Sequence, residues 1–286
     1  MRYMSFEGEG RASYGIATDL GIHDLGARIG SVIPDLKSYL RASELGLVPA
    51  TAADLATDYA VGDIAYLPPI TEPGKVICVG LNYEGHRLET GRPMQTYPTL
   101  FARFADTLIG HGVAIRRPPV SEALDYEGEL AVVIGRSGFR IPRGEAASFV
   151  AGYACFNDAS LRDFQNHTHQ FMPGKNFPAT GAFGPDMVTP DEVGALDALK
   201  IETRLNGVVV QQAKLDELLF SIEELIAYVS IFTALSPGDV LVTGTPGGVG
   251  FKRTPPLFMK PGDVVEVEID KVGQLRNEIA EELPKG

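Results

Sequence analysis

Two glutamates, Glu127 and Glu129, come just before an unbroken apolar run at residues 130–134. Residues two apart in a β-strand point to the same face, so the two carboxylates are expected to lie side by side. The apolar run predicts a strand buried on both faces. Adjacent carboxylates at the end of such a strand must be protonated, paired with cations or bound to a metal ion. The alternative is a carboxylate pair at a solvated strand end, because E-x-E alone is a weak pattern.

A third acidic residue, Asp158, follows another apolar strand predicted at residues 151–156. Together with Glu127 and Glu129 it forms an oxygen-only ligand set, which suits Mg²⁺, Mn²⁺ or Ca²⁺ better than zinc. Three carboxylates leave coordination positions open for a chelating substrate and water, as a catalytic metal requires. The alternative role for Asp158 is to cap a helical turn predicted at residues 159–165.

A candidate acid–base pair, His86 and Glu89, follows a short apolar strand predicted at residues 75–80. On a helical turn, residues three apart share a face, so the carboxylate can orient the imidazole and raise its basicity. The alternative is a surface pair without a function. A polar segment that follows a strand ending on glycine is a usual place for a functional site.

Two further segments are candidates for substrate contact. Lys175 is flanked by glycine, asparagine and aromatic residues, and a lysine near acidic groups can polarise a carbonyl or stabilise an oxyanion. The glycine-rich loop at 243–250 lacks the phosphate-loop pattern, because Phe251 precedes Lys252. Its backbone amides or Thr245 are better suited to approach a small anion.

Three other basic residues have less specific surroundings. Arg103, in a predicted strand, is expected either to face an anionic substrate or to lie at the surface. His167 and His169 belong to a polar segment that predicts a mobile loop, and they are expected to decorate this loop rather than to bind a metal.

The elements that must position these residues are mainly strands. Asn206 and Gly207 separate two strand patterns at 199–205 and 208–213, which predicts a hairpin. Ser221 opens a predicted helix with a capping box, and the helix is expected to end before Ser-Pro-Gly at 236–238. Further strands are predicted near 239–242, 264–269 and 275–279.

Composition limits the class of protein. The chain has 286 residues with 32 glycines and 20 prolines, which allows a sizeable core and favours strands over a helical bundle. The net charge of −12 argues against nucleic-acid binding and means that an anionic substrate needs local cations. Cys78 and Cys155 lie in apolar runs and are expected to be buried thiols. No signal-peptide pattern or apolar run of membrane-span length is present, so a cytoplasmic location is expected.

Residues 1–70 are predicted to form a small N-terminal domain, and residues 71–286 a larger one. The first part contains short strand patterns at 2–6, 13–18 and 21–25, a helical pattern at 36–45 and a polar segment at 51–59. A proline- and glycine-rich hinge at 68–74 follows. No chemistry is apparent in this part, and a role in packing or dimer support is expected.

Six motifs, taken together, resemble the fumarylacetoacetate hydrolase family, in particular its acylpyruvate hydrolase-like branch. They are V-G-L-N-Y-x-x-H-x-x-E at 79–89, D-Y-E-G-E-L at 125–130, N-D-A-S-x-R-D-x-Q at 157–165, G-K-N-F at 174–177, T-G-T-P-x-G-V-G at 243–250 and P-G-D-V-V-E-V-E-I at 261–269. One departure concerns the substrate: many members continue G-K with S-F-D-T, whereas this chain has N-F-P-A-T at 176–180.

The resemblance implies an α+β, mainly β fold, with a mixed β-roll or sandwich catalytic domain, and a homodimer. It also implies a role for individual residues: Glu127, Glu129 and Asp158 as metal ligands; His86 and Glu89 as a catalytic dyad on a lid; Lys175 as the lysine beside the metal; Tyr83, Arg162, Gln165 and Thr245 as substrate contacts.

The hypothesis from these residues is metal-dependent hydrolysis of a carbon–carbon bond in a 1,3-diketo acid of the acylpyruvate or fumarylpyruvate type, in small-molecule or aromatic catabolism. His86, oriented by Glu89, takes a proton from the attacking water, and Lys175 and Gln165 stabilise the oxyanion. Three alternatives remain open. They are decarboxylation or tautomerisation of a 2-oxo diacid such as oxaloacetate, hydration or isomerisation of an unsaturated 2-oxo acid, and metal-dependent binding of oxo acids without catalysis.

Overall fold

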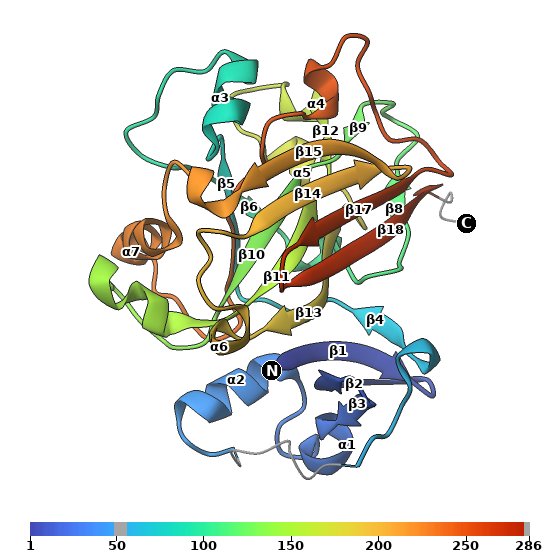
Figure 1. The fold of residues 1–286 in the computed structure, drawn as a ribbon, viewed down its shortest axis with the longest axis vertical. Coiled ribbons are helices and arrows are strands. Elements are labelled where there is room, and N and C mark those ends of the chain that lie inside the picture. Colours follow the sequence, from blue (N-terminus) through green and yellow to red (C-terminus); the bar gives the residue numbers. More distant parts are fainter. Residues whose placement is uncertain (49–55, 283–286) are drawn as a thin grey trace.

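A computed structural model describes residues 1–48 and 56–282, and its main feature is an eleven-stranded, mostly antiparallel sheet (Figure 1). Across the sheet the strands are β3 (Gly21–Asp24), β2 (Arg11–Thr18), β1 (Arg2–Gly8), β13 (Gly181–Val188), β11 (Val150–Asp158), β10 (Gly128–Ile134), β16 (Val240–Val242), β5 (Val76–Gly80) and β6 (Thr99–Arg103), with β4 (Ala65–Leu67) beside β1 and β7 (Leu108–Ile109) beside β13.

A second sheet of five strands packs in front of β10 and β11 (Figure 1). Its order is β15 (Val208–Lys214), β14 (Lys200–Leu205), β17 (Val264–Ile269), β18 (Gly273–Glu281) and β8 (Ile115–Arg117), and a separate pair joins β9 (Leu124–Asp125) to β12 (Ser160–Leu161). The predicted hairpin is confirmed, since Asn206 and Gly207 join β14 to β15 with φ values of 53° and 77°. Positive φ at both residues is what a two-residue turn of this kind requires.

Strand β10 contributes side chains to the cores on both faces of the main sheet. Leu130, Val132 and Ile134 belong to the core shared with the five-stranded sheet. Ala131 and Val133 belong to the core on the other face, which the N-terminal part covers. Every residue of β10 is buried, so the predicted burial on both faces is confirmed. The resulting α+β, mainly β architecture is the predicted fold class.

Seven α-helices are described, most of them short. They are α1 (Leu25–Ile29), α2 (Leu36–Glu44), α3 (Glu84–Thr90), α4 (Arg162–Gln165), α5 (Met172–Lys175), α6 (Pro190–Val193) and α7 (Ile222–Phe232). The predicted capping box is confirmed, because Ser221 and Glu224 each bond the other's backbone N–H at the start of α7. In the part of the chain that the structure covers, no helix is long and apolar enough to cross a membrane.

Five short 3₁₀ turns join these elements. They are η1 (Val61–Asp63), η2 (Ala105–Thr107), η3 (Arg143–Phe149), η4 (Leu215–Glu217) and η5 (Gly250–Lys252). The helical turn expected at 159–165 begins only at Arg162, because Ser160 and Leu161 form β12, which pairs with β9. Cys78 and Cys155 are buried free thiols, as expected.

The N-terminal part continues the main sheet. Its elements β1, β2, β3, α1 and α2 lie together, drawn in blue (Figure 1), and β1 pairs with β13 at Arg2–Val188 and Tyr3–Met187. Leu36 and Leu40 of α2 share a core with Val240 and Val242 of β16. The domain boundary at residue 70 stays a prediction, and residues 51–55 of the predicted polar segment lie outside the described residues.

Candidate active site

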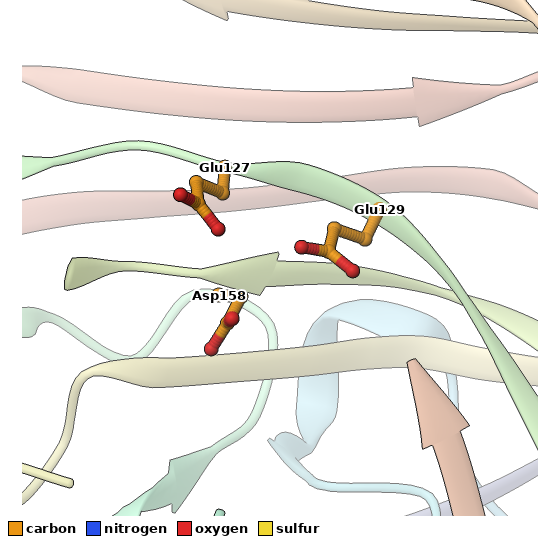
Figure 2. A group of neighbouring side chains, drawn as sticks. All are labelled: Glu127, Glu129 and Asp158. Atoms are coloured by element: carbon orange, nitrogen blue, oxygen red, sulfur yellow. The ribbon is translucent and has the colours of Figure 1, made fainter. Parts of the chain in front are cut away.

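The strand pair β10–β11 brings the three predicted metal-binding carboxylates together. Gly128 pairs with Asn157, and the Asp158 N–H donates to the Glu127 carbonyl at 2.9 Å. Glu129 lies two residues further along the same face, so all three side chains converge (Figure 2). Their carboxylate oxygens lie within 4.8 Å of one another, and all three residues are buried.

Two glycines allow this close approach. A Cβ at Gly128 would meet the Thr203 hydroxyl of β14 at 2.0 Å, so only glycine lets the two sheets pack closely beside Glu129. Gly244 has a φ of +102°, and in this conformation its N–H donates to Oε2 of Glu129 at 2.5 Å. Glycine adopts such a conformation without the strain that a side chain would cause.

Three buried cations surround the carboxylates. The Lys175 Nζ lies 2.6 Å from Glu127 Oε2 and 2.7 Å from Asp158 Oδ2. Arg162 Nη1 donates to Glu127 Oε1 at 2.6 Å, and Arg103 Nε donates to Asp158 Oδ1 at 2.8 Å. The Arg103 side chain has no solvent exposure, so the expected surface or substrate-facing position of this residue is wrong.

The alternative role of Asp158 as a helix cap is also wrong. The residue before α4 is Leu161, and no side chain caps this helix. Both carboxylate oxygens of Asp158 instead accept hydrogen bonds from buried cations, Arg103 and Lys175. Charge-assisted bonds of this kind are stronger than a bond to a neutral backbone amide, so the cations determine where the carboxylate points.

Glu129 is the carboxylate whose charge the surrounding protein does not balance. Among residues 1–48 and 56–282 it forms no ion pair, and its partner is the neutral Gly244 N–H. Burial raises the pKa of Glu129 well above its ordinary value, and the charges of Asp158 and Glu127 raise it further. A divalent cation would remove this repulsion, and the oxygen-only donor set fits Mg²⁺, Mn²⁺ or Ca²⁺.

The neighbouring groups are held in their charged forms. Burial favours the neutral form of Glu127, but Lys175, Arg162 and His86 together outweigh it and lower the pKa to about 2. Burial likewise opposes the charge on Lys175, but Asp158 and Glu127 outweigh it and raise the pKa. Lys175 is therefore an ammonium ion at neutral pH, able to stabilise negative charge but not to act as a base.

His86 and Glu89 form the expected pair on one face of α3. His86 Nδ1 lies 2.7 Å from Glu89 Oε1, and Glu89 Oε2 accepts the Gly248 N–H at 2.9 Å. A carboxylate only accepts, so Nδ1 carries the proton and the Nε2 lone pair is available as a base. His86 is buried, which excludes a purely surface pair.

A cavity of about 120 Å³ connects His86 with Glu127 and Glu129, whereas Glu89 and Asp158 lie behind its wall. Its walls include six of the predicted site residues: His86, Glu127, Glu129, Arg162, Gln165 and Lys175. Thr245 also lines it, although its hydroxyl already donates to the Gly128 carbonyl at 3.0 Å and accepts from Gln211 at 2.7 Å. Tyr83 lies in the main core, where its hydroxyl has no partner among the described residues.

Comparison with known proteins identifies the family. Residues 75–280 match the family model described as fumarylacetoacetate (FAA) hydrolase, C-terminal. This chain belongs to the fumarylacetoacetate hydrolase family. The recognition made from the six motifs is confirmed.

Similar members of this family differ in their named activities. The oxaloacetate tautomerase fahd2, mitochondrial, of Xenopus laevis is 38% identical, and the match covers 98% of this chain and 90% of that protein. The oxaloacetate tautomerase YisK of Bacillus subtilis is 40% identical over 77% of this chain and 75% of its own length. Maleylpyruvate hydrolase of Sphingobium, solved with manganese(II) and pyruvate, has a TM-score of 0.80 at 26% identity over 99% of this chain and 100% of its own. This chain is therefore similar to enzymes acting on small 2-oxo acids.

Asp125, a residue of one family motif, organises the site although no role was predicted for it from the sequence. Asp125 Oδ2 accepts from Arg162 Nε at 2.8 Å, and Oδ1 accepts the Gly250 N–H at 2.8 Å. It thereby connects the arginine that holds Glu127 to the glycine-rich loop. A signal for it was present, since Asp125, Glu127 and Glu129 alternate at the spacing of a single strand face.

Proposed function

We propose that this chain is a divalent-metal-dependent tautomerase of a 2-oxo diacid of the oxaloacetate type. The observation that carries the proposal is one cavity lined both by His86, a base held in position by Glu89, and by the carboxylates Glu127 and Glu129. Similarity to oxaloacetate tautomerases along most of the chain supports this reaction. The hydrolase predicted from the sequence is the second candidate.

Glu127, Glu129 and Asp158 would hold the metal, with Mg²⁺ as the expected ion. A bound divalent cation at these residues supplies Lewis-acid stabilisation to the enolate form of a 2-oxo acid. The cations Lys175 and Arg162 hold Glu127 in its ionised form, which is the form that binds metals. Glu127 is therefore a negatively charged ligand over the whole physiological pH range.

In the proposed reaction the side chains of the protein transfer protons and stabilise charge. His86 Nε2 removes the proton from the carbon next to the keto group, and the Glu89 carboxylate stabilises the imidazolium that forms. The Lys175 ammonium lies beside the carboxylates and stabilises the negative charge that develops on the oxygen. Return of the proton to the oxygen or to the carbon completes the interconversion of keto and enol forms.

The hydrolase alternative requires an additional group, a water placed for attack on a second carbonyl. It is favoured by the structural similarity to maleylpyruvate hydrolase, and the same dyad would then take a proton from that water. The cytoplasmic location and the homodimer stay predictions, as does a role in aromatic catabolism.

The direct test follows the enol absorbance of oxaloacetate in the presence of Mg²⁺, together with CO₂ and organic-acid analysis. A tautomerase accelerates loss of the enol signal without releasing CO₂ or a shorter acid. Release of CO₂ and pyruvate would indicate a decarboxylase, and cleavage of acetylpyruvate to acetate and pyruvate would indicate the hydrolase. A protein that binds these acids but turns over none of them would be a binding protein.

His86→Ala tests the base. The expected result is loss of about 10²–10⁴-fold in turnover, the usual contribution of a general base. Mg²⁺ affinity, measured by isothermal titration calorimetry, should stay unchanged because the three carboxylates remain. Full turnover in this variant would contradict the role of the dyad.

A further inference from the structure

The cavity is lined by more cationic side chains than form ion pairs with the buried carboxylates. Four cationic residues line it: Arg92, Arg162, Lys175 and Lys252. Arg162 and Lys175 are committed to ion pairs with Glu127 and its neighbours. Arg92 and Lys252 form no ion pair with any residue that the structure describes, and both are exposed at the rim.

The backbones of both rim residues are held in place. Arg92 follows the end of α3, where its N–H donates to the Arg87 carbonyl at 3.2 Å and its carbonyl accepts from Arg87 Nη1 at 2.9 Å. Lys252 ends η5, whose Gly250 and Phe251 N–H groups donate to the Asp125 carboxylate at 2.8 and 3.0 Å. Arg92 thus directly follows the helix that carries the dyad. Lys252 belongs to a turn whose backbone is hydrogen-bonded to Asp125.

We propose that Arg92 and Lys252 form a second anion subsite that binds the distal carboxylate of a 2-oxo diacid. The proposal rests on the proposed function, in which the substrate's keto group and adjacent carboxylate lie at the metal end of the cavity. A chain with a net charge of −12 repels a dianion unless local cations attract it. The two unpaired cations lie on the same cavity as the acidic centre, at its solvent side, where the far end of such an acid emerges.

The subsite selects between substrates by charge at one end. A diacid places its second carboxylate against two cations, whereas a monoacid of the same length leaves both cations solvated. Arginine can make two parallel hydrogen bonds to a carboxylate, and lysine contributes a point charge. The apolar wall residues Leu81, Phe101 and Phe171 supply no polar partner for a distal carboxylate through their side chains.

Malate and lactate are matched probes, since malate is lactate with a carboxylate in place of one methyl hydrogen. We would measure the affinity of the full chain for each acid by calorimetry with saturating Mg²⁺. The unmodified protein should prefer malate. Arg92→Gln should weaken malate binding about 5–20-fold and Lys252→Gln by a smaller factor, while lactate affinity stays constant.

Arg140→Gln is the matched control. Arg140 lies over the ring of the preceding Phe139 at 5.0 Å, as Lys252 lies over the preceding Phe251 at 5.1 Å, but Arg140 lines a different surface pocket. Its removal lowers the net charge of the protein equally and should leave the malate-to-lactate ratio unchanged. An equal loss in this control would assign the effect to net charge and overturn the subsite.

The outcomes separate the two proposals. Equal affinities for malate and lactate in the unmodified protein, or an unchanged ratio in the Arg92→Gln, Lys252→Gln double variant, overturn the subsite whatever the activity. A ratio that collapses in the double variant while oxaloacetate is not tautomerised keeps the subsite and rejects the proposed reaction. Tautomerase activity of the unmodified protein, with an unchanged malate-to-lactate ratio in the double variant, supports the proposed reaction and rejects the subsite.

Discussion

Two buried carboxylates, Asp24 in the N-terminal part and Glu129 in the acidic cluster between β10 and β11, differ in how their charge is balanced. Asp24 is 1% exposed and accepts hydrogen bonds from Arg11 at 2.5 Å, Ser13 at 2.5 Å and the Ala27 N–H at 2.8 Å. Its charge is fully compensated within a short stretch of chain. Glu129, equally buried, has two acidic neighbours and, among residues 1–48 and 56–282, no ion-pair partner.

We interpret this difference as that between a structural carboxylate, Asp24, and a proposed metal ligand, Glu129. Burying an uncompensated charge is costly, so a fold retains it only where another group compensates it. At Asp24 the compensation comes from the chain, which also uses the carboxylate to begin α1. At Glu129 we propose that a divalent cation supplies it, because no residue in the described ranges forms an ion pair with this carboxylate. Three substitutions, and one control variant, test this contrast.

Glu129→Gln should have the largest effect. Without this carboxylate the metal-bound state loses a ligand and several kcal/mol of transition-state stabilisation, so turnover should fall by about 10³-fold or more. The rise in Tm that Mg²⁺ produces should also disappear, because a ligand stabilises only the state that binds it. Differential scanning calorimetry with and without Mg²⁺ is the measurement.

Glu202→Gln is the control for Glu129→Gln, because Glu202 is a buried glutamate paired with Lys200 and Arg204 outside the site. It should retain the Mg²⁺-induced rise in Tm. A Glu129→Gln protein that still gains stability with Mg²⁺ would show that Glu129 is not a ligand.

Asp24→Ala should act on stability and leave the site unaffected. The substitution removes the N-cap of α1 and leaves the buried Ser13 hydroxyl without its acceptor, which together cost about 2–4 kcal/mol. Urea unfolding monitored by circular dichroism gives the loss, and Mg²⁺ affinity of the folded variant should equal that of the unmodified chain. Weaker Mg²⁺ binding by the folded variant would contradict the prediction that Asp24 acts on stability and not on the metal site.

The charge of Asp186 is partly balanced, more than that of Glu129 and less than that of Asp24. Its substitution should give the smallest of the three effects. Burial raises its pKa, the cation Arg2 at 3.6 Å opposes this only partly, and the result is a pKa of about 6. Because the folded-state pKa is raised, the carboxylate destabilises the fold above pH 6, and this penalty disappears as the pH falls toward 4. Asp186→Asn should therefore stabilise the protein by about 1–2 kcal/mol at pH 8 and by nothing near pH 4.

Unfolding of the unmodified chain and of Asp186→Asn by urea at both pH values checks this prediction. Arg2 keeps other partners in the variant, since its guanidinium also donates to the Val272 and Lys271 carbonyls. A stability difference that does not change between pH 4 and pH 8 would mean that Asp186 titrates normally.

The sequence alone determined the features that depend on nearby residues. The hairpin at Asn206-Gly207, the capping box at Ser221 and the buried strand β10 follow from local backbone preferences and from the spacing of apolar residues. The spacing of Glu127 and Glu129 on one face, and of His86 and Glu89 on one helical turn, was predictable for the same reason. Asp158 was grouped with the two glutamates because it follows a second apolar strand, and the resemblance to the family placed Lys175 beside them.

Only the tertiary structure decided which charges meet. Arg103 pairs with Asp158 across 55 residues of chain, and Lys175 reaches Glu127 across 48. The sequence does not specify such contacts, because they depend on the order of strands in the sheet. They also depend on burial, since a buried charge is costly unless it is paired. The same packing joins β1 to the main sheet and leaves Glu129 without an ion-pair partner among the residues that the structure describes. Three buried carboxylates that converge, this unpaired glutamate among them, are the physical reason to expect a metal there.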